Sequence, residues 1–147
     1  MKTLPTPDRL ARLVSNVTET RLGISFRADV ARQARVPLIC RTATLRIPGA
    51  RPLTVGLSSD AAGCVALGAA LFAAEAGSVD QEMIDDSLRE LVNMTAGLLK
   101  TLLGLDQLLG LPRIVEAALE PELKGSHTVV LRAEQLGLVL WVAEGGF

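Results

Sequence analysis

Two polar residues one turn apart, Glu90 and Asn93, stand out within the helical pattern DDSLRELVNMTAGLLK. A carboxamide both donates and accepts hydrogen bonds, and a carboxylate brings a fixed negative charge. Asn93 and Gly97 are poor helix formers, so helix stability alone does not explain their place here. Gly97 also removes side-chain bulk beside Asn93, so a second backbone can come close. Such a face can dock a partner and present an amide and a carboxylate to it.

The helical repeat places these residues on one side of a helix. With Asp86 at zero and about 100° per residue, Asn93 falls at about −20°, Gly97 at about +20° and Glu90 at about +40°. Lys100 falls at about −40°, so the polar arc is roughly 80° wide. The opposite side carries Ile84, Leu88, Leu91, Thr95, Leu99 and Leu102. The helix is therefore amphipathic. A plain solvated face is the competing interpretation, because Glu-x-x-Asn alone is a weak pattern.

Composition limits the classes of function. The chain has 147 residues, of which 49% are hydrophobic, and a formal net charge of −1. Disorder is excluded, and neither nucleic acid nor an anionic membrane is favoured as a partner. The N-terminus reaches Pro5 and Asp8 too early for a signal peptide, and the longest charge-free apolar run, residues 61–74, is too short to span a bilayer. We expect one cytoplasmic domain over residues 1–147.

Metal and redox sites find no support in the residue pattern. Cys40 and Cys64 form no Cys-x-x-Cys pair, and we expect both to be buried thiols. One histidine, His127, belongs to no metal-spaced cluster. No Ser or Cys is matched with a His and an acid in a nucleophilic arrangement. The expectation is a chain without a bound metal or cofactor.

The elements around the polar arc follow from periodicity and capping. A helix is expected from a cap at Thr6 to Gly23. Ser58–Asp60 offer caps for an apolar helix that Gly77 would end, and Ser78 would start the long helix through a capping box with Gln81. That helix should stop near Leu103 and Gly104. Alternation predicts strands over residues 24–30, 36–47, 52–57, 127–133 and 136–142.

The order of these elements predicts an α+β class, with a mixed or antiparallel sheet and long helices packed on it. Residues 105–119 are ambiguous because Pro112 breaks any single helix there. Residues 120–126 should form a loop, and the last two strands a hairpin. Trp141 is expected in the core or in a subunit interface.

On these residues the chain resembles the CheC/CheX chemotaxis phosphatases. Their signature is Asp or Ser, three residues, Glu, two residues, Asn, and Gly four residues later. Asp86, Glu90, Asn93 and Gly97 match it, and the stretch ELVNMTAG is closer to the CheX branch. The first expected helix has no Glu-x-x-Asn, which agrees with a CheX-like chain carrying one site per subunit. The resemblance implies a CheC-like fold and a homodimer.

The same resemblance implies an activity: hydrolysis of the aspartyl phosphate of a CheY-type receiver domain. Asn93 would hold the attacking water, and Glu90 would pair with the receiver's active-site lysine. Asp86, Gly97 and Met94 would contact the partner, with Asp86 orienting the face or touching its periphery. Mg²⁺ would be carried by the receiver. The alternative is a non-catalytic CheC-like module that binds a receiver domain, or a flagellar-switch or signalling partner, through the same face.

Overall fold

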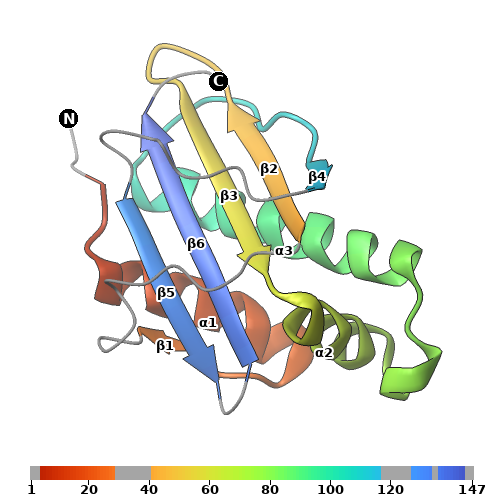
Figure 1. Ribbon diagram of the computed structural model, residues 1–147. Coiled ribbons are helices and arrows are strands. Elements are labelled where there is room, and N and C mark those ends of the chain that lie inside the picture. Colours follow the sequence, from red (N-terminus) through yellow and green to blue (C-terminus); the bar gives the residue numbers. More distant parts are fainter. Residues whose placement is uncertain (1–3, 29–40, 117–126, 134–135, 145–147) are drawn as a thin grey trace.

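A single antiparallel sheet organises the fold. The computed structural model describes residues 4–28, 41–116, 127–133 and 136–144. Within these ranges the sheet has the strand order β1-β5-β6-β3-β2-β4, and every described pairing is antiparallel (Figure 1). The strands are β1 (Arg27–Ala28), β2 (Arg41–Ile47), β3 (Leu53–Ser59), β4 (Arg113–Glu116), β5 (His127–Ala133) and β6 (Leu136–Glu144). The expected α+β class is confirmed.

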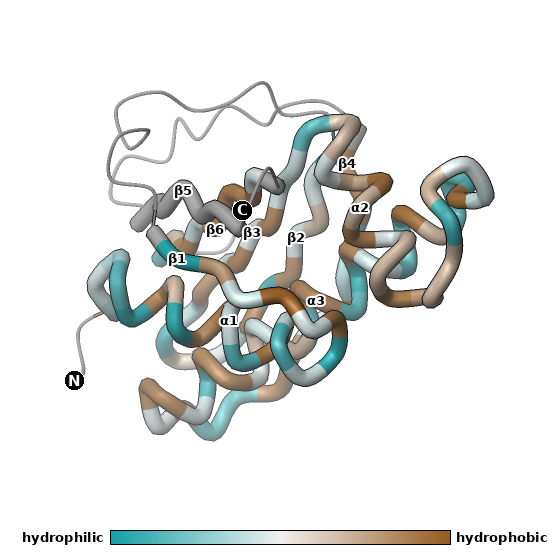
Figure 2. The backbone as a smooth tube through the Cα atoms, turned by 90° about the horizontal axis from the view of Figure 1, so that it is seen from below, coloured by the Kyte–Doolittle hydropathy of each residue, from teal (hydrophilic) through white to brown (hydrophobic). Residues whose placement is uncertain are grey.

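The core lies between this sheet and the helices. Helices α1 (Pro7–Leu22) and α3 (Gln81–Leu102) lie against one side of the sheet, and α2 (Ala61–Phe72) packs beside α3 (Figures 1 and 2). Alternate residues of the strands point to that side. On β2 these are Ala43, Leu45 and Ile47, each at most 1% exposed. Burying a large aliphatic side chain stabilises a fold by about 1.5–3 kcal/mol, so this layer fixes where α3 sits.

Helix α1 begins and ends where its capping residues predict. Thr6 Oγ1 accepts a hydrogen bond from the Arg9 amide at 3.4 Å, and Gly23 takes a left-handed φ of 68°. Beyond the helix, Ser15 Oγ binds the backbone of Phe26 twice, accepting from its amide at 2.6 Å and donating to its carbonyl at 2.9 Å. Those bonds occupy groups that a strand ladder would need. The expected strand over residues 24–30 therefore begins only at Arg27, and residues 29–30 lie outside the described part of the chain.

The expected end of the apolar helix at Gly77 is wrong. Helix α2 ends at Phe72, and Ala73 adopts φ 50°, in the left-handed region. The amides of Ala73 and Ala74 both bond to the carbonyl of Ala69, which closes the helix. The early turn lets Val79 return onto Gly68, where a Cβ would lie 2.8 Å from Val79 Cγ1. Tertiary packing thus outweighs the local signal of Gly77.

The start of the long helix also differs from the capping box expected at Ser78 and Gln81. Asp80 is the N-cap of α3, and its Oδ1 accepts from the Met83 amide at 2.9 Å. Ser78 instead closes a short 3-10 turn, Ala76–Ser78. Asp caps a helix as well as Ser does, so the alternative start costs nothing. The far end agrees with expectation, because α3 stops at Leu102 and Gly104 takes φ 65°.

Strand β3 runs further than expected, through Ser59, so Ser58 and Ser59 belong to the sheet rather than to a helix cap. Ser58 Oγ and Thr42 Oγ1 lie 2.7 Å apart, and Ser59 Oγ donates to the carbonyl of Gly137 at 2.7 Å. Asp60 alone caps α2, accepting from the Gly63 amide at 2.7 Å.

The ambiguous segment resolves into a loop and a strand. Residues 113–116 form β4, which pairs with β2 and ends the described order of the sheet. In the loop before it, Gln107 Nε2 donates to the carbonyl of Arg51 at 2.8 Å, and Gln107 Oε1 accepts from the Arg51 amide at 3.0 Å. The β2–β3 turn is therefore held by a side chain that follows α3.

Three further expectations concern burial and pairing. Strands β5 and β6 form the expected hairpin. Cys64 is buried at 2% exposure, whereas Cys40, residues 36–40 of the expected strand and residues 117–126 lie outside the described ranges. Trp141 is 4% exposed and fills the space over Gly56, where a Cβ would lie 1.9 Å from its ring. Trp141 is thus a packing residue of this chain.

Candidate functional site

Helix α3 presents the candidate site on a rigid support. Its inward side is almost closed to solvent: Leu88, Leu91 and Leu99 are each at most 1% exposed. It packs against α1 on one flank and against β2 and β4 on the other. Because the apolar stripe is fixed on both flanks, the rotation of the polar arc about the helix axis is fixed as well.

The polar arc expected from the helical wheel is present on the surface. Asp86 and Asn93 are exposed, while Glu90, Gly97 and Lys100 are partly exposed. The Asn93 carboxamide makes no hydrogen bond with any described residue. An unbonded amide on a rigid helix retains its donors and its acceptor for an incoming molecule.

Two residues next to the arc, Met94 and Ala96, differ in exposure. Met94 is partly buried and packs against the hydrophobic core, so only part of its side chain is open to a partner. Ala96 is fully buried at 0% exposure. It lies at about −80° on the wheel, on the side of β2 and β4.

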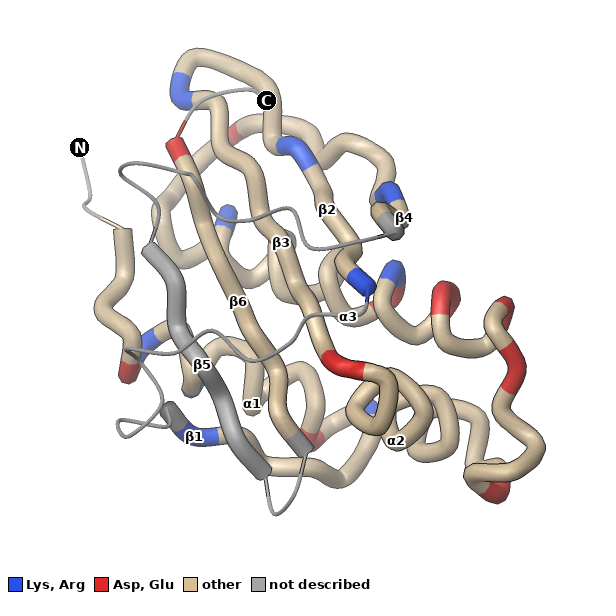
Figure 3. Tube along the Cα trace, viewed as in Figure 1, with Lys and Arg blue, Asp and Glu red and all other residues tan. Residues whose placement is uncertain are grey.

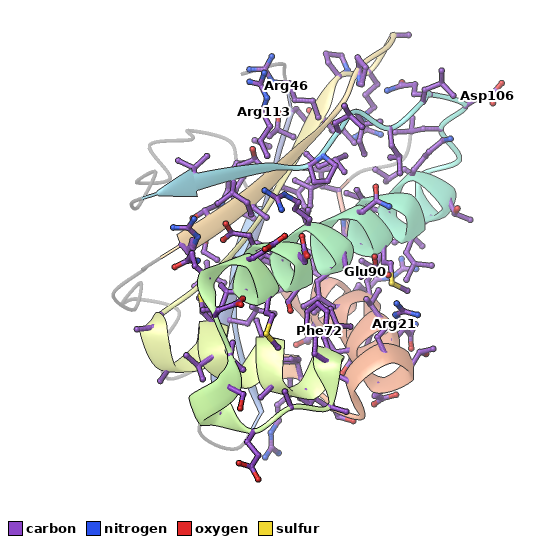
Figure 4. The ribbon with its side chains drawn as sticks, turned by 90° about the vertical axis from the view of Figure 1, so that its right-hand side faces the viewer. Arg21, Arg46, Phe72, Glu90, Asp106 and Arg113 are labelled. Atoms are coloured by element: carbon purple, nitrogen blue, oxygen red, sulfur yellow. The ribbon has the colours of Figure 1, made fainter. Side chains whose placement is uncertain are left out.

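Glu90 is held by a residue from another helix. Arg21, in the last turn of α1, donates from Nη2 to Glu90 Oε1 at 2.9 Å (Figure 4). The two side chains remain 45% and 39% exposed. Glu90 therefore stays available at the surface, but it leans toward α1 rather than extending freely from α3.

Acidic residues gather over the first half of α3 and the chain before it (Figure 3). Two arginines hold those nearest the arc. Arg89 Nη1 donates to Asp86 Oδ1 at 3.1 Å within the helix. From the sheet, Arg41 of β2 donates hydrogen bonds to the Asp85 carboxylate. Hydrogen bonding from Arg41 lowers the pKa of Asp85, with Gln81 adding to the effect against the opposing effect of burial. Asp85 stays ionised and fastens the first half of α3 to β2.

Gly97 is not required by the packing of this chain. A Cβ built there would meet Leu109 Cδ1 at 3.9 Å, which is ordinary van der Waals contact, and no closer atom. Its backbone φ is also not in the left-handed region, unlike that of Gly104. Glycine in a helix interior costs roughly 1 kcal/mol relative to alanine. The packing of the chain therefore does not explain why glycine rather than alanine stands at this position. The open space above Gly97 belongs to the same surface as Asn93.

Neither a membrane helix nor a metal cluster appears among the residues described. No described helix has the length and apolar character needed to cross a bilayer. Across the same residues, no group of three or more His, Cys, Asp or Glu side chains is arranged to hold a metal ion. What the arc offers chemically is one carboxamide without a described hydrogen-bond partner, two carboxylates, the Lys100 ammonium and a space beside Asn93.

Comparison with known proteins identifies the family. The sequence profile described as chemotaxis phosphatase CheX matches residues 41–133, more than half of the chain, including all of α3. The chain belongs to the CheX family. The family inferred from the signature Asp86, Glu90, Asn93 and Gly97 is therefore confirmed. A sequence comparison with curated proteins finds no match.

Solved structures share the CheX fold over nearly the whole chain. The chemotaxis protein CheX from Vibrio vulnificus has a TM-score of 0.79 at 13% identity, covering 99% of this chain and 100% of that one. A CheX–CheY–BeF3–Mg complex from Borrelia burgdorferi gives 0.68 at 14%, with 98% and 100% covered. The FliM–SpeE complex from H. pylori gives 0.64 at 10%, with 93% and 82% covered. At these identities the likeness establishes the fold.

The sequence did not reveal Arg21 or the Arg41–Asp85 pair. Arg21 lies 69 positions from Glu90, and Arg41 lies 44 from Asp85. Contacts between residues this far apart do not produce a periodic pattern in a single sequence, so the sequence alone does not predict them. An arginine in the last turn of a helix is read locally as a favourable charge at the helix C-terminus, which hides its role toward a second helix.

Proposed function

We propose that this CheX-family protein dephosphorylates the aspartyl phosphate of a CheY-type receiver domain by docking it against the polar arc of α3. The observation that carries the proposal is the arrangement of the arc: an exposed Asn93 carboxamide that makes no hydrogen bond with a described residue, beside the tethered Glu90 and the open space of Gly97. The chemotaxis family and the fold shared with the CheX chain of a CheX–CheY complex support it.

The chemistry needs little covalent participation from this chain. In hydrolysis of an acyl phosphate, a water oxygen bonds to phosphorus in line while the bond from phosphorus to the aspartate oxygen breaks. Positioning and charge compensation provide most of the acceleration. Asn93 would accept a hydrogen bond from the water through its amide oxygen and fix its direction of attack. The products are a free aspartate carboxylate and inorganic phosphate, and the protons of the attacking water stay on phosphate oxygens or pass to solvent.

Glu90 would serve docking rather than the attack on phosphorus. Its carboxylate would pair with the lysine of the receiver's active site, which places Asn93 against the phosphoryl group. Gly97 would let the receiver backbone approach α3, and Asp86 and the exposed part of Met94 would border the contact. Mg²⁺ belongs to the receiver in this scheme. That assignment, the homodimer and the cytoplasmic location remain predictions.

A second candidate is a binding module that uses the same arc without catalysis. The fold does not separate the two, because it is shared with a chain of the FliM–SpeE complex as well as with CheX chains. A fold alone does not determine a function, so the residues of the site must distinguish a phosphatase from a binding module. The Asn93 amide fits either role, because binding interfaces also use polar side chains for hydrogen bonds to a partner. The match to a family described as chemotaxis phosphatase is what favours catalysis.

The deciding experiment follows phosphate release from several phosphorylated receiver domains in Mg²⁺, with and without the protein. Catalysis predicts multiple turnovers at a protein concentration far below that of the receiver. A binding module predicts complex formation, measured in parallel by titration, with an unchanged rate of phosphate loss. Binding without acceleration on every receiver would exclude the phosphatase.

A further inference from the structure

The two acids of the polar arc are held in place, whereas its amide is not. Arg21 holds Glu90 from α1, and Arg89 holds Asp86 from within α3. No hydrogen bond joins Asn93 to a described residue. The difference between the two arginines is their origin: Arg89 is three positions from its partner, whereas Arg21 lies in a separate helix (Figure 4).

The base of Arg21 is itself well fixed. It lies one residue before the end of α1, next to the left-handed cap at Gly23. Thr18 Oγ1 donates to the carbonyl of Ile24 at 2.6 Å, and the Ser15 hydroxyl engages both backbone groups of Phe26. These bonds tie the end of α1 to the chain that follows it. A guanidinium at this end of a helix is also favoured by the helix dipole.

The contact uses only one oxygen of Glu90. Oε1 accepts from Arg21 Nη2 at 2.9 Å, and no bond joins Oε2 to a described residue. The side chain keeps 39% of its surface exposed. The carboxylate is thus fastened on the side of α1 and open on the side of the arc. A second cation can reach Oε2 without displacing Arg21.

We propose that Arg21 is a positioning residue for partner docking, which holds the Glu90 carboxylate ready for an ammonium group of the receiver domain. The inference rests on the proposed function. A glutamate without a tether samples several rotamers, and binding must then restrict them. Arg21 restricts them before the partner arrives. Its own positive charge opposes a second cation, but Arg21 and that cation would sit on different oxygens, and salt screens the repulsion between them.

The test compares Arg21→Met with Arg21→Lys and with the control Arg12→Met. Arg12 is an exposed arginine of α1 that forms no ion pair with a described residue. Phosphate release is measured against receiver concentration at moderate and at raised salt. We expect Arg21→Met to raise KM about threefold to tenfold at moderate salt and to leave kcat unchanged, since immobilising one side chain has a cost of that order. The effect should be smaller at raised salt, because salt screens the exposed Arg21–Glu90 pair. Arg21→Lys should restore part of the loss, and Arg12→Met should match wild type.

The outcomes separate this inference from the proposed function. Wild-type protein that accelerates phosphate release, together with an Arg21→Met variant of unchanged or lower KM, would overturn the positioning role alone. Wild-type protein inactive on every receiver would overturn both. Unfolding midpoints of the variants should stay close to wild type, because an exposed ion pair contributes little to stability. A fall in kcat equal to the rise in KM would assign Arg21 to the chemical step and also reject positioning.

Discussion

Arg41 on β2 and Asp85 on α3 form a two-point ion pair that fastens the motif helix to the sheet. Arg41 Nη2 donates to Asp85 Oδ2 at 2.9 Å, and Arg41 Nε donates to Oδ1. The two side chains are 14% and 15% exposed. Gln81 Nε2 adds a bond to Oδ1 at 3.0 Å. The next residue in the chain is Asp86, so this anchor lies directly beneath one end of the candidate site.

The Arg41–Asp85 ion pair predicts that Asp85→Asn lowers the free energy of unfolding in a pH-dependent way. Hydrogen bonding from Arg41 holds the pKa of Asp85 below its usual 3.8. A lowered folded-state pKa adds stability above the unfolded pKa, which is lost as pH falls through the folded value. We expect Asp85→Asn to lower the free energy of unfolding by about 1–3 kcal/mol near neutral pH. The deficit should shrink below pH 3.8. Urea unfolding at several pH values measures it.

Asp106→Asn is the control for that series. Asp106 is exposed and forms no ion pair with a described residue. We expect little change at any pH. A deficit of Asp85→Asn that stays constant down to acidic pH would mean that the charge of Asp85 is not what stabilises the helix.

Asn93→Ala should abolish the acceleration of phosphate release without weakening the fold. Asn93 is exposed and unbonded within the described chain, and alanine is the better helix former by roughly 0.5 kcal/mol. The variant should therefore unfold at an equal or higher denaturant concentration. Asn16→Ala, at an exposed position of α1, is the matched control and should keep full activity. Full activity in Asn93→Ala would eliminate the amide from the mechanism.

Gly97→Ala should stabilise the protein and impair docking. The new methyl meets Leu109 Cδ1 at 3.9 Å, so the gain in helix propensity, up to about 1 kcal/mol, is kept. Gly68→Ala is the matched case inside α2. There a methyl would lie 2.8 Å from Val79 Cγ1, and stability should fall.

Chemical unfolding and receiver titration of both variants check this pair. A Gly97→Ala variant that is more stable and still binds the receiver as tightly as wild type would show that the space above Gly97 is not used by the partner.

Thr95→Val should stabilise the helix from its buried side. Thr95 is 1% exposed, and its Oγ1 has no hydrogen-bond partner among the residues that the structure describes. A buried hydroxyl without a partner costs about 1–3 kcal/mol, so replacing it with a methyl of similar volume should recover part of that cost. Thr18→Val, which removes the bond to the Ile24 carbonyl, should destabilise. Equal losses in the two variants on thermal unfolding would contradict this account.

The sequence predicted what depends on short-range periodicity and capping. The polar arc of α3, its apolar stripe, the two ends of α1 and the closing hairpin all follow from neighbours within a few positions. The errors have different causes. Ala73 rather than Gly77 ends α2, where Val79 packs on Gly68. At the start of α3, Asp80 and Ser78 are both good capping residues, and local sequence does not decide between them.

The residues of the candidate site also fall into two groups: those that a short-range pattern predicts and those that it does not. Asp86, Glu90, Asn93 and Gly97 could be predicted as site residues because they lie within about three turns of one helix. Arg21 could not be found, since its relation to Glu90 exists only once α1 and α3 have packed. Gln107 was missed for the same reason, because its bonds to the β2–β3 turn join residues 56 positions apart. Side chains that position a site across the fold leave no local signal.

The order of strands sets the sequence of events during synthesis. Strand β6 lies between β5 and β3, so the inner part of the sheet is completed by residues 136–144. Its partner on β3, residues 53–58, leaves the ribosome long before it. Until β6 arrives, Val55 and Leu57 have no strand neighbour on the β6 side of β3. Pairing at such sequence separation slows folding. The helix that carries Asn93 contacts α1, α2, β2, β3 and β4, all of which precede β6 in the chain, so the support of the candidate site is synthesised before the strand that completes the sheet.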